Sequence, residues 1–155
     1  MNCRTNMIPS GIQNTLLQQL YKSSCYFLSI IHIAEKNSPY LSVDIIRFAI
    51  ECIDNKWLEK DFTVIRPDKI LGKLLDKEVT VIALNEKEKD LLQTMEYKAV
   101  INNWYNPKTG LHHFNTDDWD SLVNSKTVKE GYIVGYRVFN WKEVPNDCLN
   151  NMLFF

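Results

Sequence analysis

Residues 25–34 are the feature that most limits how this chain can fold. Read as a helix, the segment carries apolar side chains on nearly its whole surface, interrupted only by Ser29 and His32. A helix that is apolar all round must be enclosed by other elements, and this one is far too short to cross a bilayer. The segment therefore predicts a buried core helix that begins at Cys25.

Helical patterns dominate the rest of the first half. Apolar residues at helical spacing predict one helix before Cys25, one after Ser42, one that starts at Pro67, and a short one that ends near Met95. Side chains that can accept hydrogen bonds from free helix amides precede three of the five expected helices: Ser23 and Ser24, Ser42, and Asn85 with Glu88.

The second half has the shorter runs of β-branched and aromatic residues that are typical of strands. We expect strands at residues 79–84, 99–105, 111–115, 118–122 and 132–139, with a turn at 106–110 and a hairpin between 111 and 122. Helices followed by an antiparallel sheet define the α+β class. We expect a single domain over residues 1–155, with its core at about 8–139 and a C-terminal extension at 140–155.

Composition excludes several functions. The net charge is −1, so no basic field is present to hold nucleic acid. The four cysteines form no C-x-x-C pair and have no His at zinc-ligand spacing, so we expect neither a metal nor a disulfide framework. We find no apolar signal segment near the N-terminus and no membrane span, and we expect a cytoplasmic protein.

Cys25 is the candidate nucleophile. A helix N-terminus lowers the pKa of a thiol, and the free amides of the first turn can also hold an oxyanion. Gln19, six residues earlier, is a plausible second oxyanion donor through its side-chain amide. The competing interpretation is that Cys25, next to Tyr26 and Phe27, is only a small buried hydrophobic residue.

A thiol nucleophile needs a base, and the chain has three histidines. His32 lies two helical turns from Cys25, about 10 Å away, which is too far for proton transfer. His112 and His113 are neighbours on one expected strand and point to opposite faces, so at most one can serve Cys25.

The hairpin register favours His113. If residues 116 and 117 form the loop, His113 lies opposite Asp120, where a carboxylate can orient the imidazole. The same register places Phe114 against Trp119. Other partners stay open, because a bulge would move the pairing by one residue and separate His113 from Asp120. The rival orienting groups for the base are Asn115, Asp117 and Asp118.

The order Gln19, Cys25, His113, Asp120 resembles that of papain-like cysteine peptidases, in particular the branch related to bacteriocin-leader-processing peptidases. There, a His-Phe pair opens a strand and a hydrophobic residue followed by Asp comes later. The matching residues here are His113-Phe114 and Trp119-Asp120-Ser121. Residues 24–29, 125–132 and 136–139 are similar to an uncharacterised domain family of bacterial plasmids and prophages, and the likeness covers about residues 8–139.

The resemblance implies a papain-like cysteine hydrolase that cleaves a peptide or amide bond with a Cys25–His113–Asp120 triad, Gln19 at the oxyanion, and no cofactor. A peptide, an isopeptide or a peptidoglycan cross-link are all open as substrates, and oligomeric state is not predicted. The alternative is a non-catalytic papain-like domain that binds peptides or partner proteins. Aromatic residues expected in or near loops, and the C-terminal tail, suit that role: Trp57, Trp104, Tyr105, Trp141 and residues 153–155.

Overall fold

A computed structural model of the chain describes residues 10–123 and 126–143. Helices α1 (Ser10–Ser23), α2 (Cys25–Asn37), α3 (Ile45–Asp54) and α4 (Pro67–Leu75) come first, followed by β1 (Val79–Asn85) and the 3₁₀ helix η2 (Glu86–Gln93). Strands β2 (Ala99–Asn106) and β3 (Leu111–Asn115), helix α5 (Lys126–Glu130) and strand β4 (Tyr132–Trp141) complete the order. The α+β class with helices first is confirmed, and none of the described helices has the length and apolar character that a bilayer crossing requires.

Helix α2 is the buried core helix that the sequence predicts. Phe27, Ile30 and Ala34 are fully buried. The ring of Phe27 packs against the rings of Phe48 in α3 and Phe62 in the loop that follows it. Because α2 is enclosed by its neighbours, its first residue is held firmly in place.

Two of the predicted helix caps are wrong, and two helix starts are confirmed. Asp44, not Ser42, caps α3 by accepting a hydrogen bond from the Arg47 amide. Ser24 precedes α2, but its hydroxyl bonds back to the Leu20 carbonyl of α1, because a single residue separates the two helices. Helix α4 begins at Pro67, and η2 begins with the predicted capping box of Asn85 and Glu88.

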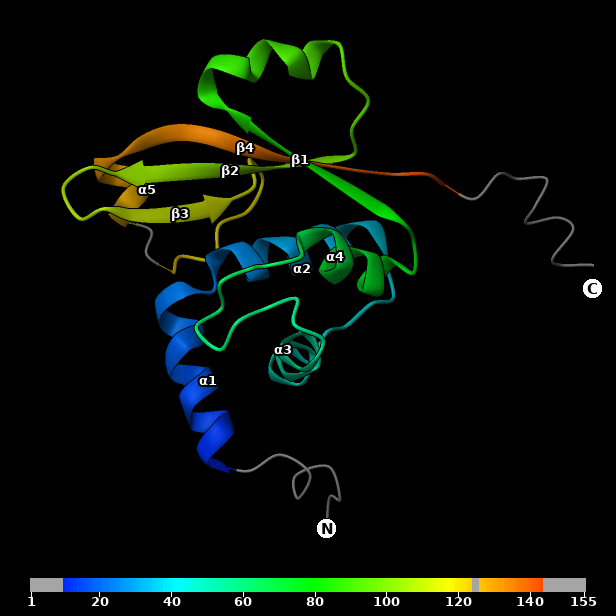
Figure 1. Cartoon of the computed structure of the whole chain (residues 1–155), viewed down its shortest axis with the longest axis vertical. Helices are drawn as coiled ribbons and strands as arrows, with labels where there is room; N and C mark the ends of the chain where they lie inside the picture. The colour runs from blue at the N-terminus through cyan, green and yellow to red at the C-terminus, as the bar shows by residue number, and fades with distance from the viewer. Residues whose placement is uncertain (1–9, 124–125, 144–155) are drawn as a thin grey trace, which may run out of the picture.

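The four strands form one antiparallel sheet in the order β1-β4-β2-β3. Figure 1 shows the helices α2, α3 and α4 on one side of the sheet and η2 on the other. A large core fills the space between the sheet and the helices. A smaller cluster of Leu84, Tyr136 and Val138 packs beneath η2, with Leu92 and Met95 beside it. Because β3 is last in the strand order, it is an edge strand, and one of its sides is not paired with another strand.

The predicted strand at residues 118–122 is absent, which corrects the expected hairpin. After β3 the chain makes only an isolated bridge between Thr116 and Trp119, with Asp117 and Asp118 in the turn. Trp119 stacks on His32 of α2 rather than on Phe114. This segment thus contacts α2 and does not join the sheet. The next regular element is the short helix α5.

Candidate active site

Cys25 is the first residue of α2 and lies against the outer edge of β3. Its Sγ accepts a hydrogen bond from the Phe114 amide over 3.3 Å. One turn later, Ser29 Oγ donates to the Phe114 carbonyl over 3.2 Å. Helix α2 therefore covers the free edge of β3, and the sulfur lies next to the peptide unit that joins His113 to Phe114.

His113 has one ring nitrogen engaged and one without a partner. The side chain is fully buried, and its Nε2 lies 2.8 Å from Asp120 Oδ1. Its Nδ1 is buried and makes no hydrogen bond to any described residue. The predicted contact between His113 and Asp120 is thus present, although the strand that was expected to carry Asp120 is not formed.

Asp120 is held by further hydrogen bonds. Its Oδ1 accepts from the Leu122 amide over 3.0 Å and its Oδ2 from Asn115 Nδ2 over 3.2 Å. Burial raises the pKa of Asp120, but these bonds and His113 outweigh the burial and hold the pKa below its ordinary value. Asp120 therefore carries a fixed negative charge beside the imidazole.

Asn115 links this carboxylate to the sheet. Its Oδ1 accepts hydrogen bonds from Trp104 Nε1 over 3.0 Å and from Asn102 Nδ2 over 3.2 Å. Both donors lie on β2, and Trp104 is the residue paired with His113. From the sequence, Asn115 was only a rival of Asp120 as the group that orients the base. Its role as a support for Asp120 depends on the strand pairing.

The other two rivals have partners elsewhere. Asp117 accepts a hydrogen bond from Asn102 over 2.8 Å. Asp118 accepts from Lys36 over 2.8 Å and lies 3.3 Å from His32 Nε2. The Lys36 ammonium, together with Thr116 and His32, lowers the pKa of Asp118. His32 thus contacts Asp118, which agrees with a structural role and not with a role as the base for Cys25.

His112 lies on the other face of β3 and is exposed. Its Nδ1 is 2.8 Å from Asn103 Oδ1, and its ring packs near that of Tyr105. It also lines the cavity in front of Cys25. His112 is thus a wall residue of the cavity, and no carboxylate hydrogen bonds to it within the described ranges.

A cavity of about 670 Å³ opens in front of the thiol. Cys25 and Gln19 both line it, together with Asp61 and Thr63. The chain near Gln19 is fixed through Ser23, whose Oγ donates to the Asp61 carbonyl over 2.6 Å and to the Gln19 carbonyl over 3.3 Å. Gln19 is therefore close enough to the thiol to share its cavity, and its oxyanion role stays a prediction.

Burial raises the pKa of the Cys25 thiol above its ordinary value. The amides of Phe114, Tyr26 and Cys25 itself act in the opposite direction, and the charge of Asp120 adds to the rise. Cys25 is 4% exposed, so a bare thiolate would be poorly solvated there. A stable thiolate at this position requires a positive charge beside it.

The remaining cysteines give no second thiol site in the described residues. Cys52 is fully buried in α3, and burial raises its pKa to about 12. Cys3 and Cys148 lie outside the described residues. No group of three or more His, Cys, Asp or Glu side chains in residues 10–123 and 126–143 is arranged to hold a metal ion.

Comparison with known protein families, with curated proteins and with solved structures finds no match to this chain.

Proposed function

We propose that this protein is a cysteine hydrolase of papain-like fold that cleaves a peptide or amide bond. The observation that carries the proposal is the hydrogen bond from the Phe114 amide to Cys25 Sγ. It puts the thiol at the head of a core helix beside the backbone of His113, whose Nε2 is bonded to Asp120 and whose Nδ1 is without a partner. Nucleophile, base and orienting carboxylate in that order are what acyl transfer by a thiol needs.

In the proposed reaction, His113 Nδ1 takes the thiol proton and leaves a thiolate–imidazolium pair. The thiolate attacks the carbonyl carbon of the substrate, a C–S bond forms, and the carbonyl oxygen becomes an oxyanion. The Cys25 amide and the Gln19 side chain are the donors proposed for that oxyanion. His113 then gives its proton to the leaving nitrogen as the C–N bond breaks, and water hydrolyses the thioester with His113 as base.

The support around the imidazole favours this assignment. Asp120 keeps its negative charge and can stabilise the imidazolium, while Asn115 and the Leu122 amide fix the orientation of the carboxylate. The Phe114 amide adds a hydrogen bond that stabilises the thiolate form of Cys25. The Phe114 amide thus opposes the effect of burial on the thiol directly, whereas Asp120 acts through the imidazolium that it stabilises.

A non-catalytic domain that binds peptides in the same cavity is the second candidate. The raised pKa of Cys25 and the low exposure of its side chain favour it. In that case the thiol is a packed apolar group, and the cavity holds a ligand without chemistry.

Turnover on a peptide library separates the two candidates. The full chain is incubated at pH 6.5 with a mixture of peptides, and mass spectrometry identifies new termini, with Cys25→Ala as the matched control. The hydrolase proposal predicts cleavage products and a thioester adduct on Cys25 that are both absent from the control. Peptide binding without products, and with a Cys25 that does not react below pH 8, would overturn it.

A further inference from the structure

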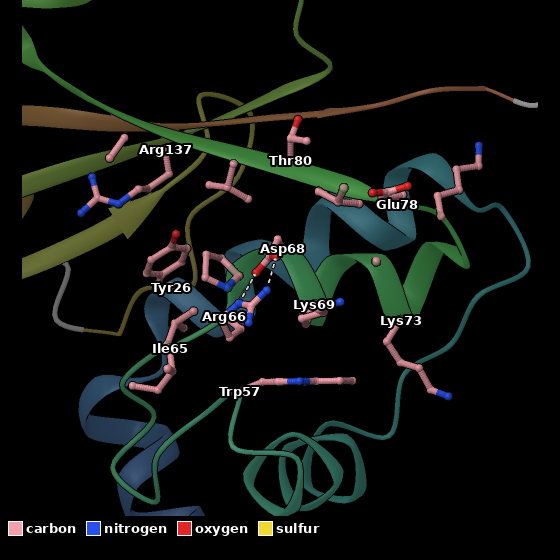
Figure 2. A pocket seen from close by; sticks show the side chains of 17 residues that line it. Tyr26, Trp57, Ile65, Arg66, Asp68, Lys69, Lys73, Glu78, Thr80 and Arg137 are labelled. Atoms are coloured by element: carbon pink, nitrogen blue, oxygen red, sulfur yellow. Dashed lines mark hydrogen bonds and ion pairs between the residues drawn. The ribbon is translucent and has the colours of Figure 1, made fainter.

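The cavity in front of Cys25 adjoins a second, larger one of about 990 Å³ between the sheet and the helices. Tyr26, Val64 and Arg137 line both cavities. Figure 2 shows Arg137 projecting from the sheet above Tyr26, with Arg66, Asp68 and Lys69 farther along the larger cavity. The two cavities are thus adjacent, we call them together the groove, and Arg137 lines both.

Arg137 is close to the thiol. It lies on β4, which is flanked on both sides by other strands, and it is half-buried. Its guanidinium lies over the Phe114 ring, 5.8 Å from the ring centre, and the Phe114 amide contacts Cys25. Phe114 therefore contacts the guanidinium through its ring and the proposed nucleophile through its amide.

Arg137 and the exposed Lys69 form no ion pair with any carboxylate of the described residues, unlike three other cations of the groove. Arg66 is bound by both oxygens of Asp68, at 3.0 and 2.9 Å. Lys73 pairs with Glu51 at 3.6 Å, and Lys77 pairs with Glu143. Arg137 Nη1 donates a long hydrogen bond to the Tyr136 carbonyl over 3.4 Å, and its other neighbours are the neutral phenol of Tyr26 and the Phe114 ring. Burial raises the pKa of that phenol, so it stays neutral.

A half-buried cation without a counter-ion is costly, and a guanidinium matches a carboxylate in geometry. We propose that Arg137 is a specificity-determining residue that binds a carboxylate of the substrate next to the bond that Cys25 cleaves. The substrate class is then an acidic amide, such as a peptide or isopeptide with an Asp, a Glu or a terminal carboxylate beside the scissile bond. This inference rests on the proposed function, because it assigns the substrate of the same site.

Protection of the thiol tests the inference without a known substrate. Alkylation of Cys25 by iodoacetamide is followed in the full chain with N-acetylglutamate or its neutral counterpart N-acetylglutamine as competitor. We expect saturable protection by N-acetylglutamate that is at least fivefold stronger than by N-acetylglutamine, and that weakens as salt is raised. Arg137→Gln should abolish the difference, Arg137→Lys should restore part of it, and Lys73→Gln should leave it unchanged.

A second probe depends on charge alone. Iodoacetate and iodoacetamide differ by one negative charge, so the ratio of their rates at Cys25 reports the local field. We expect the ratio to fall about fivefold in Arg137→Gln and to be unchanged in Lys73→Gln. Equal protection by the two competitors in the wild type would overturn the inference even if Arg137→Gln fails to fold.

The failure of this inference is distinguishable from failure of the proposed function. If His113→Ala slows alkylation at pH 6 but Arg137→Gln leaves both the competitor preference and the rate ratio unchanged, the hydrolase stands and the acidic substrate is wrong. If His113→Ala has no effect on alkylation, the proposed function fails, and the assignment of Arg137 to that function fails with it.

Discussion

The amide of Phe114 donates a hydrogen bond to Sγ of Cys25, although the two residues lie 89 positions apart in the chain. This contact fixes the head of α2 against the edge of β3 at the residue that follows His113. In the proposed reaction it serves twice, because it holds the thiol beside the backbone of the residue that follows the base and it stabilises the thiolate.

Asp120 is predicted to orient His113 and to stabilise its positive charge. Asp120→Asn removes the charge while it keeps the shape and one acceptor oxygen, so we expect Cys25 alkylation at pH 6 to slow at least tenfold. Asp117→Asn is the matched control, because that carboxylate bonds to Asn102 and not to His113. Equal rates in the two variants would exclude Asp120 from the proposed triad.

The lowered pKa of Asp120 also predicts how stability depends on pH. A carboxyl group with a lower pKa in the folded state stabilises the fold above the pKa of the unfolded chain, near 3.9, and that stabilisation is lost as pH falls through the folded value. We expect Asp120→Asn to flatten the fall of unfolding free energy below about pH 4, as measured by urea denaturation. If the free energy of unfolding falls as steeply at acid pH in Asp120→Asn as in the wild type, the charge of Asp120 does not contribute to this pH dependence.

Ser29 is predicted to fasten α2 to β3. Its buried hydroxyl contacts both the Cys25 carbonyl and the Phe114 carbonyl, so Ser29→Ala should lower the free energy of unfolding by about 1 kcal/mol. Thr15→Ala is the control, because the Thr15 hydroxyl bonds only to Gly11 within its own exposed helix. That variant should change stability by less than about 0.5 kcal/mol. Similar losses in the two variants would contradict a fastening role for Ser29.

Cys52 is predicted to have a packing role only. Cys52→Ala should leave the alkylation rate of Cys25 unchanged and should lower stability by about 1 kcal/mol, because it leaves a small gap in a fully buried site. Peptide mapping after alkylation at pH 6 should show the label on Cys25 and not on Cys52, whose pKa burial raises to about 12. Labelling of Cys52 at this pH would contradict that role.

Periodicity and local signals predicted most of the elements. The buried helix at Cys25, the start of α4 at Pro67, the capping box before η2 and four of the five strands follow from local patterns. The cap of α3 is Asp44, a local cap two residues after the expected Ser42. The segment after β3 does not follow from local patterns, because tertiary contacts decide it. Asp118 accepts a hydrogen bond from Lys36, and Trp119 stacks on His32, both in α2. Contacts between residues so far apart in the chain cannot be predicted from a local sequence pattern.

The predicted contact between His113 and Asp120 is present for a different reason from the one expected. The expected hairpin register placed them opposite each other on two strands, whereas the structure brings Asp120 to the ring on an irregular segment held by Asn115 and the Leu122 amide. The unpaired charge of Arg137 was not predicted. Its position becomes informative only once the sheet order places it beside the groove.

The pH dependence of Cys25 alkylation tests the central claim most directly. The account predicts that iodoacetamide labels wild-type Cys25 down to about pH 5–6, because a thiolate–imidazolium pair with His113 overcomes the effect of burial. In His113→Ala no imidazolium offsets the effect of burial on the thiol, and labelling should require a pH above about 8.5, whereas His112→Ala should behave as wild type. A wild-type thiol that reacts only at high pH, and that is indifferent to His113→Ala, would contradict the account.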